Sequence, residues 1–244
     1  YVDLCGEPGW MHEMIAAHGE TAKRTGARIV FSCGFDSVPF DLGVHFLQQA
    51  AQKRFGHALP RVRGRVRSMK GTFSGGTLAS FKATMAAAAE QPELVKVLMD
   101  PFALTPGFTG PQQPSGTRPV HEDDLGSWSA PFVMATINTK NIHRSNFLMA
   151  HAYSEDFTYD EMMLTGPGDE GEKMARAVAA DNSMAESPRQ PGEGPSREER
   201  ENGYYDVLFV GSSAQGDLLK AREKGDKEPG YGSTSKMIAE SAVC

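Results

Sequence analysis

Two carboxyl groups and a hydroxyl stand close together in residues 34–41, where an apolar run gives way to a helical pattern. The apolar run 29–31 is typical of a strand buried on both faces. Ligands of open α/β sheets lie beyond the carboxyl ends of such strands. We therefore expect a substrate or cofactor to lie at Phe35, Asp36, Ser37 and Asp41.

The acids of this segment have two interpretations. As reactive groups, Asp36 and Asp41 would transfer a proton or bind a ribose or an amine. As structural groups, Asp36 or Ser37 would cap the next helix, and Asp41 would be a first-turn carboxylate favoured by the helix dipole. Asp3 and Glu7 follow a second apolar run, and acids at adjacent strand ends favour a shared site.

Three loop-to-helix junctions, at 34–41, 71–77 and 230–235, combine small residues with hydroxyls. A helix N-terminus with free N–H groups binds an anion or a polarised carbonyl. The strongest candidate is the run Gly75-Gly76-Thr77. The alternative is that these residues only cap helices, with Ser233 or Thr234 as the cap of the last one.

The composition of the chain argues against several classes of binding partner. The net charge of −6 argues against nucleic acid and anionic membranes as general partners. No apolar run reaches the length of about 18 residues that a membrane helix needs, so no stable membrane insertion is expected. The alternating arginines within 61–67 predict one solvated strand face, with phosphate contact as the alternative.

The sequence lacks the motifs of several common kinds of functional site. The three cysteines form no CxxC pair and resemble the reduced thiols of a cytoplasmic protein, and no His or Cys spacing predicts a metal site. The serines lack a Gly-x-Ser-x-Gly elbow, which leaves a hydrolase triad without support. The chain also contains no Gly-x-Gly-x-x-Gly after a strand and no phosphate-binding P-loop.

The order of patterns predicts an α/β fold that begins as the tail of a Rossmann-type parallel sheet and continues as a mixed sheet flanked by helices, with α+β character in the second part. Helical patterns are predicted at 8–25, 38–55, 77–91, 92–99, 138–150, 169–186 and the C-terminal segment. Extended segments are predicted at 27–33, 61–69 and 157–164, with a hairpin from 204–211 and 217–223. Residues 105–127 are predicted to be a long loop and 187–203 a flexible connector.

Five segments, spread from the first residue to the last helix, resemble one family. They are Tyr1-Val-Asp-Leu-Cys-Gly-Glu7, the run from Gly34 to Gly43, Ser74-Gly-Gly-Thr77, Pro191-Gly-Glu-Gly-Pro195, and Gly230-Tyr-Gly-x-Thr-x-Lys-Met237. In this order they resemble the saccharopine dehydrogenase-like oxidoreductases, in the branch that includes trans-acting enoyl reductases.

The resemblance implies a reductase that uses NADP or NAD, with a glycine fingerprint in a Rossmann domain ahead of Tyr1. We therefore expect this sequence to be a fragment, inactive alone and without measurable NADPH binding. Residues 1–56 would complete the nucleotide-binding domain, 57–226 would form the substrate domain, and 227–244 would return toward the first domain.

The resemblance also implies roles for single residues. Cofactor contacts would come from Asp3, Gly6, Glu7, Gly34, Phe35 and Asp41. Substrate contacts would come from Gly75, Gly76 and Thr77. The candidate catalytic groups, as proton donors, are Asp36, Ser37 and Tyr231. No set of basic groups suits the several carboxylates of saccharopine.

Two hypotheses about function follow. The first is a hydride-transfer reductase acting on a carbonyl, imine or enoyl substrate, either a small molecule or an acyl or lipid chain. The second is a non-enzymatic relative that binds a lipid or a partner protein in the same cleft. A homodimer is compatible with both.

Overall fold

The computed structural model describes residues 1–244 as a mixed α/β structure built on one six-stranded sheet. The strand order is β2-β3-β4-β1-β5-β6. Only β1 and β4 run parallel, and all other neighbours are antiparallel. The strands are β1 Arg61–Lys70, β2 Val120–Glu122, β3 Ser127–Pro131, β4 Thr158–Gly166, β5 Tyr204–Ser212 and β6 Leu218–Gly225. The predicted fold class is confirmed.

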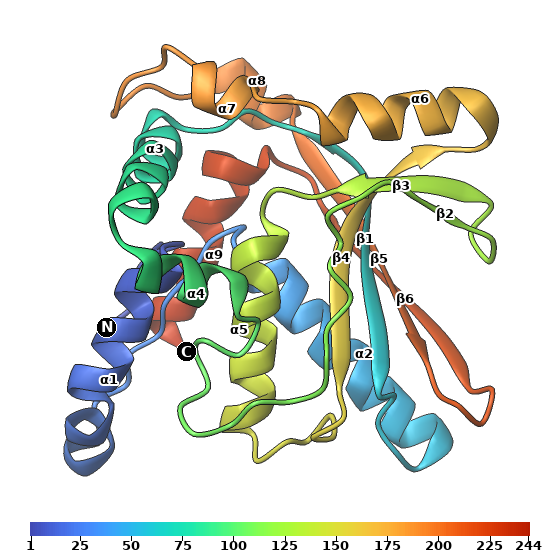
Figure 1. Ribbon diagram of the computed structural model, residues 1–244, viewed down its shortest axis with the longest axis horizontal. Coiled ribbons are helices and arrows are strands. Elements are labelled where there is room, and N and C mark those ends of the chain that lie inside the picture. The colour runs from blue at the N-terminus through green and yellow to red at the C-terminus, as the bar shows by residue number, and fades with distance from the viewer.

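Most helices lie on one side of this sheet, whereas the helix that follows β4 lies across the end of the sheet near β3 (Figure 1). The longer ones are α1 Pro8–Thr25, α2 Val38–Phe55, α3 Gly75–Glu90, α5 Ala135–Leu148, α6 Gly168–Ala179 and α9 Thr234–Val243. The shorter ones are α4 Pro92–Met99, α7 Ser183–Glu186, α8 Arg197–Asn202 and the π-helical turn η1 Pro229–Ser233. None of the helices combines the length and apolar character needed to cross a membrane.

The main core lies between α2, α5 and the inner face of the sheet. Phe40, Val44 and Leu47 of α2 are fully buried there, because a helix with an apolar face gains most by covering a sheet. The close approach depends on Gly43, where a Cβ would lie 2.2 Å from the ring of Phe209 on β5. This packing fixes the start of α2, and with it the loop 34–37.

Several predicted elements are confirmed at nearly the predicted bounds, and others differ. The hairpin is β5–β6, and 92–99 is α4. The predicted long loop at 105–127 instead contains the short strand β2 and reaches the first residue of β3. The predicted connector at 187–203 contains α8, which begins with a capping box between Ser196 and Glu199. The predicted helix at 169–186 is divided into α6 and α7.

The segment 27–33 was expected to be a buried strand, and that prediction is wrong. It forms a single parallel bridge, between Val2 and Val30, extended by a hydrogen bond from Cys33 N to Asp3 O of 2.8 Å. Ile29 and Val30 remain 42% and 51% exposed, because no further strand flanks this pair.

Candidate functional site

The five segments that carry the family resemblance meet in space although they are far apart in the chain. The backbone N–H of Phe35 donates to Thr234 Oγ1 at 2.9 Å, which joins the start of α2 to the start of α9. The N–H of Gly75 and the hydroxyl of Tyr231 both donate to the carbonyl of Glu193, at 2.9 and 3.4 Å. In Figure 1 the helices α1, α3 and α9 lie on one side of α5.

Asp36 lies half-buried in this region, close to two other acids. Burial and, to a smaller extent, the charge of Glu7 together raise the pKa of its carboxyl to about 7. Burial also raises the pKa of Glu161 on β4, to about 8, and Asp36 is among the charges that contribute. Glu161 accepts hydrogen bonds from Asn138 Nδ2 and Tyr159 OH, both at 2.9 Å. A carboxyl group that titrates near neutral pH is suited to proton transfer.

Asp3, Gly6 and Glu7 form a tight turn beside this cluster. Asp3 Oδ1 accepts from the N–H of Cys5 at 2.9 Å, and Glu7 Oε2 accepts from the N–H of Gly6 at 2.9 Å and from the Cys5 thiol at 3.1 Å. The pKa of Glu7 lies below its usual value. Burial acts to raise it, but hydrogen bonds, first that from Ser80, outweigh this effect. Glu7 is thus charged at neutral pH, whereas Asp36 has a pKa near neutral pH.

Ser37 and Asp41 bind the start of α2 to α5. Asn141 Nδ2 donates to Ser37 Oγ at 2.8 Å, and Ser145 Oγ donates to Asp41 Oδ2 at 2.6 Å. Burial raises the pKa of Asp41 to about 6, although the bond from Ser145 lowers it. Neither Asp36 nor Ser37 makes a side-chain cap for α2. The structure therefore places Ser37 and Asp41 in the helix contact and leaves Asp36 as the half-buried acid of the loop.

Two of the N–H groups at the start of α3 already have acceptors. Gly75 N binds the carbonyl of Glu193, and Thr77 N binds Ser74 Oγ at 3.0 Å. A Cβ on Gly75 would lie 1.6 Å from the carbonyl oxygen of Gln190, so only glycine permits the loop 187–195 to lie this close. Gly76 has no such neighbour. A ligand at this junction would have to displace the loop.

The third junction contains an acid that the sequence analysis missed. Glu228 is 1% exposed, and its carboxylate accepts from the N–H groups of Gly230, Tyr231 and Gly232 at 2.6, 2.7 and 3.2 Å. The predicted caps Ser233 and Thr234 do not cap α9, because this carboxylate caps the preceding turn η1. An acid directly before Pro229 was the available signal, since acids and prolines both favour a helix start.

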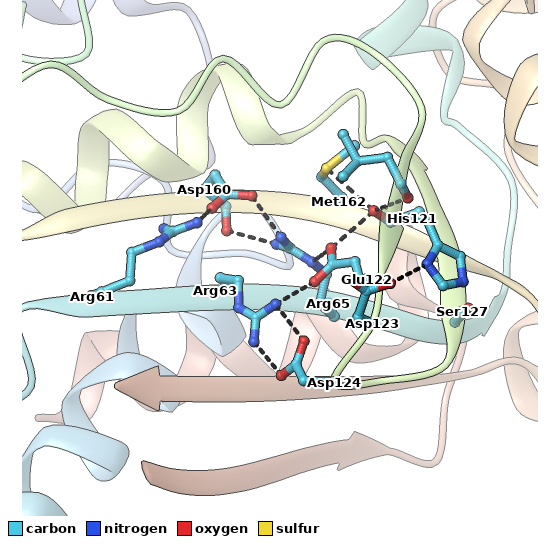
Figure 2. A network of polar contacts seen from close by, with 12 residues as sticks. Arg61, Arg63, Arg65, His121, Glu122, Asp123, Asp124, Ser127, Asp160 and Met162 are labelled. Carbon is cyan, nitrogen blue, oxygen red and sulfur yellow. Dashed lines mark hydrogen bonds and ion pairs between the residues drawn. The ribbon is translucent and has the colours of Figure 1, made fainter. Parts of the chain in front are cut away.

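The predicted solvated arginine face is wrong for three of its four arginines. Figure 2 shows Arg61, Arg63 and Arg65 of β1 directed toward carboxylates of β4 and of the β2–β3 hairpin. Arg65, 3% exposed on its side chain, pairs with Glu122 and also lies 2.8 Å from Asp160. The remaining pairs are Arg61 with Asp160 and Arg63 with Glu122 and Asp124.

A cavity of about 490 Å³ borders these ion pairs and is lined on its other side by residues 114–118. The three arginines are matched by three carboxylates, which satisfies the rule that buried charges are paired. The network therefore fastens the β2–β3 hairpin to the sheet. Sequence periodicity could show that the arginines share a face, but it could not show what covers that face.

Only the nicotinamide and ribose end of a nicotinamide cofactor fits these residues, and its phosphates do not. The N–H groups of Gly75, Gly230 and Gly232 are occupied, and the acids near Asp36 would repel phosphates. The same acids suit the hydroxyls of a ribose and the amide of an uncharged nicotinamide. The carboxyl groups of Glu7 and Asp36 would face the nicotinamide end. No cluster of three or more His, Cys, Asp or Glu side chains is arranged to hold a metal ion.

Known proteins similar to this chain bear enoyl reductase names. A Mycobacterium tuberculosis H37Rv protein, assigned provisionally by its name to the trans-acting enoyl reductases, is 37% identical over 267 aligned residues, covering 98% of this chain and 63% of the relative. Trans-acting enoyl reductases of Mycobacterium ulcerans and Mycobacterium bovis BCG are each 29% identical, covering the whole chain and 64% of the relative. The chain thus spans less than two thirds of these relatives' length.

No family model matches the sequence, and no solved structure matches it. The names of these curated relatives agree with the enoyl-reductase branch of the predicted resemblance.

Proposed function

We propose that this chain forms the substrate-binding part and one wall of the cofactor cleft of an NAD(P)-dependent enoyl reductase of the saccharopine dehydrogenase-like family. The observation that carries the proposal is the similarity over 98% of the chain to a protein with an enoyl reductase name. In this proposal residues 1–56 belong to the nucleotide-binding unit, 57–226 to the substrate unit, and 227–244 connect back to the first.

When bound, the cofactor supplies a hydride to the double bond of the substrate. The chain must then deliver a proton to the neighbouring carbon. Asp36 is the proposed donor, because burial keeps its pKa near 7 and a large fraction is protonated at neutral pH. Ser37, 2% exposed and bonded to Asn141, acts as a positioning residue for the loop, and Tyr231 is the remaining candidate donor.

We further propose that the substrate is an acyl chain presented by another protein, as the word "trans-acting" in the relatives' names suggests. All three cysteines are free thiols, which supports the cytoplasm as the compartment of the reaction.

A second function is favoured by one observation. The N–H groups of Gly75 and Thr77, and those of Gly230, Tyr231 and Gly232, are bound by groups of the chain itself and are not free for a cofactor phosphate. A non-enzymatic relative that binds a lipid or partner in the same region would show this arrangement too.

An activity assay on the protein expressed from its whole gene distinguishes the two functions. The assay follows NADPH oxidation with a crotonyl thioester as substrate. We expect Asp36→Asn to lower kcat by about 10²-fold or more, with partial recovery in Asp36→Glu. Because the acid form is required, the wild-type rate should fall as the pH rises above about 7. Absence of any reduction would favour the binding protein, and an unchanged pH profile in Asp36→Asn would exclude Asp36 as the donor.

A further inference from the structure

The outer face of the β5–β6 hairpin carries exposed side chains along β6, although Val210 and Asp206 of β5 on the same face are buried. Side chains along β6 alternate, so that Leu219, Ala221 and Glu223 turn toward α2 while Lys220 and Lys224 turn away and are exposed. β6 is also the edge strand of the sheet, at the opposite end of the strand order from β2. The sheet is thus covered by helices on one face, and the part of its other face along β6 lacks a cover.

Positive charge predominates on this open face. Its five exposed basic residues, here called the basic sheet face, are Arg67, Lys70, Lys220, Arg222 and Lys224. The carboxylate among them is Asp206, which accepts two hydrogen bonds from Arg222, at 2.8 and 2.5 Å, and lies 3.9 Å from Arg67. The hydrogen bonds from Arg222 hold the pKa of Asp206 below its usual value.

The three lysines of the face have no hydrogen-bonded carboxylate partner. Lys70 and Lys220 lower the pKa of Glu199 and Asp124 only through their charge, as Lys224 does for Asp206. Gathering like charges costs free energy, and the chain as a whole carries −6, so its average surface is acidic.

Protection of the sheet edge does not account for this pattern. Charged side chains on an edge strand prevent pairing with other chains, and lysine is common in that role. Arg67 and Lys70, however, belong to β1, which lies inside the sheet between β4 and β5. The positive charge therefore comes from β1 and β6, on both sides of β5, as expected of a surface that meets another surface.

We propose that the basic sheet face docks an acidic surface of the protein that presents the acyl substrate. This inference rests on the proposed function. A folded protein is favoured over nucleic acid or membrane, because a small acidic surface can meet the basic sheet face alone, whereas an extended polyanion also meets the acidic remainder of a chain of net charge −6. The half-buried Leu208 and the exposed Leu218 add apolar contact to the same face. Lys70 leads directly into the junction at 71–77, so a partner docked here adjoins the predicted substrate residues.

The test compares two triple variants of the chain with the same change in net charge. Lys70→Glu/Lys220→Glu/Lys224→Glu reverses the face while leaving the Arg222–Asp206 pair intact. Lys23→Glu/Lys53→Glu/Lys173→Glu reverses three exposed lysines on α1, α2 and α6. A matched neutral variant carries glutamine at positions 70, 220 and 224, in case the reversed face impairs folding.

The probe is an acidic acyl-carrier domain loaded with a crotonyl group, with binding measured by calorimetry. We expect the face reversal to weaken binding at least about tenfold, the control less than about twofold, and wild-type binding to weaken between about 50 and 300 mM salt. Equal losses in both triple variants, no wild-type binding, or equally tight binding of duplex DNA or anionic vesicles would overturn the proposal. So would a self-associating chain that the face reversal converts to a monomer, since a second copy would then be the partner.

Reduction of a free crotonyl thioester by the protein expressed from its whole gene separates this inference from the proposed function. Loss of carrier binding with unchanged reduction of the free thioester supports the docking face. If the free thioester is not reduced at all, the proposed function fails, whereas the binding comparison still decides whether the face recognises an acidic protein.

Discussion

The two adjacent glycines at the start of α3 should respond in opposite ways to alanine. A Cβ on Gly75 would lie 1.6 Å from the carbonyl oxygen of Gln190, and such contacts are essentially never below 3.0 Å. The loop 187–195 would have to retreat by about 1.4 Å, a backbone movement that no side-chain rotation replaces. At Gly76 the nearest atom to the new methyl is Ser74 Oγ at 3.5 Å, an ordinary contact.

The free-energy change follows from the bonds that the retreat would break. Gly75 N–H donates to Glu193 O, and Arg189 donates to the carbonyl of Phe73 and to Thr72 Oγ1. The bond to Thr72 is exposed and contributes little, so the bond from Gly75 and the charge-assisted bond to Phe73 together correspond to about 2–4 kcal/mol. Gly76→Ala should instead gain about 0.5 kcal/mol, because alanine loses less backbone entropy than glycine in a helix.

Urea denaturation followed by circular dichroism measures both variants, and limited trypsin digestion at Arg189 reports on the loop alone. We expect Gly75→Ala either to lower the free energy of unfolding by the stated amount or to expose Arg189 to cleavage. A Gly75→Ala protein as stable and as protease-resistant as Gly76→Ala would refute the close packing of 187–195 on α3.

Two further predictions concern buried charge. Arg65→Met leaves two buried carboxylates underpaired and should cost about 3–5 kcal/mol in urea denaturation, whereas Arg67→Met at the exposed end of the same strand should cost about 0–1 kcal/mol; equal costs would contradict the buried network. Burial raises the pKa of Glu161 from 4.5 to about 8, so the folded state binds this proton more tightly, and the stabilisation is complete below about pH 4.5 and is lost as the pH rises through about 8. Urea denaturation at pH 5 and pH 8 should show lower stability at pH 8, and Glu161→Gln should reduce the difference.

Local patterns predicted much of this fold. The bounds of α1 and α2 follow from helical periodicity between glycines, and their C-caps Gly26 and Gly56 adopt the left-handed conformation that favours this residue. The period-two alternation of 61–69 correctly predicted β1. These signals succeed because propensity, periodicity and caps act within a few residues.

The failures depend on distant residues. The acid partners of Arg65 lie 57 and 95 positions away, so the sequence pattern could not show that this face is covered. The strands β2 and β3 are three and five residues long, too short for a periodic pattern. The site was located from the sequence only as a loop, because Asp36 becomes distinctive through burial and through Glu7 and Glu161.

The central claim is that this chain belongs to a reductase that transfers a hydride to an enoyl substrate. The most direct measurement uses NADPH carrying deuterium at the transferable position of the nicotinamide, with the protein expressed from its whole gene and a crotonyl thioester as substrate. The account predicts a saturated product with one deuterium on the carbon β to the carbonyl, and a solvent proton on the α carbon. A product without deuterium, or an unreduced thioester, would contradict it.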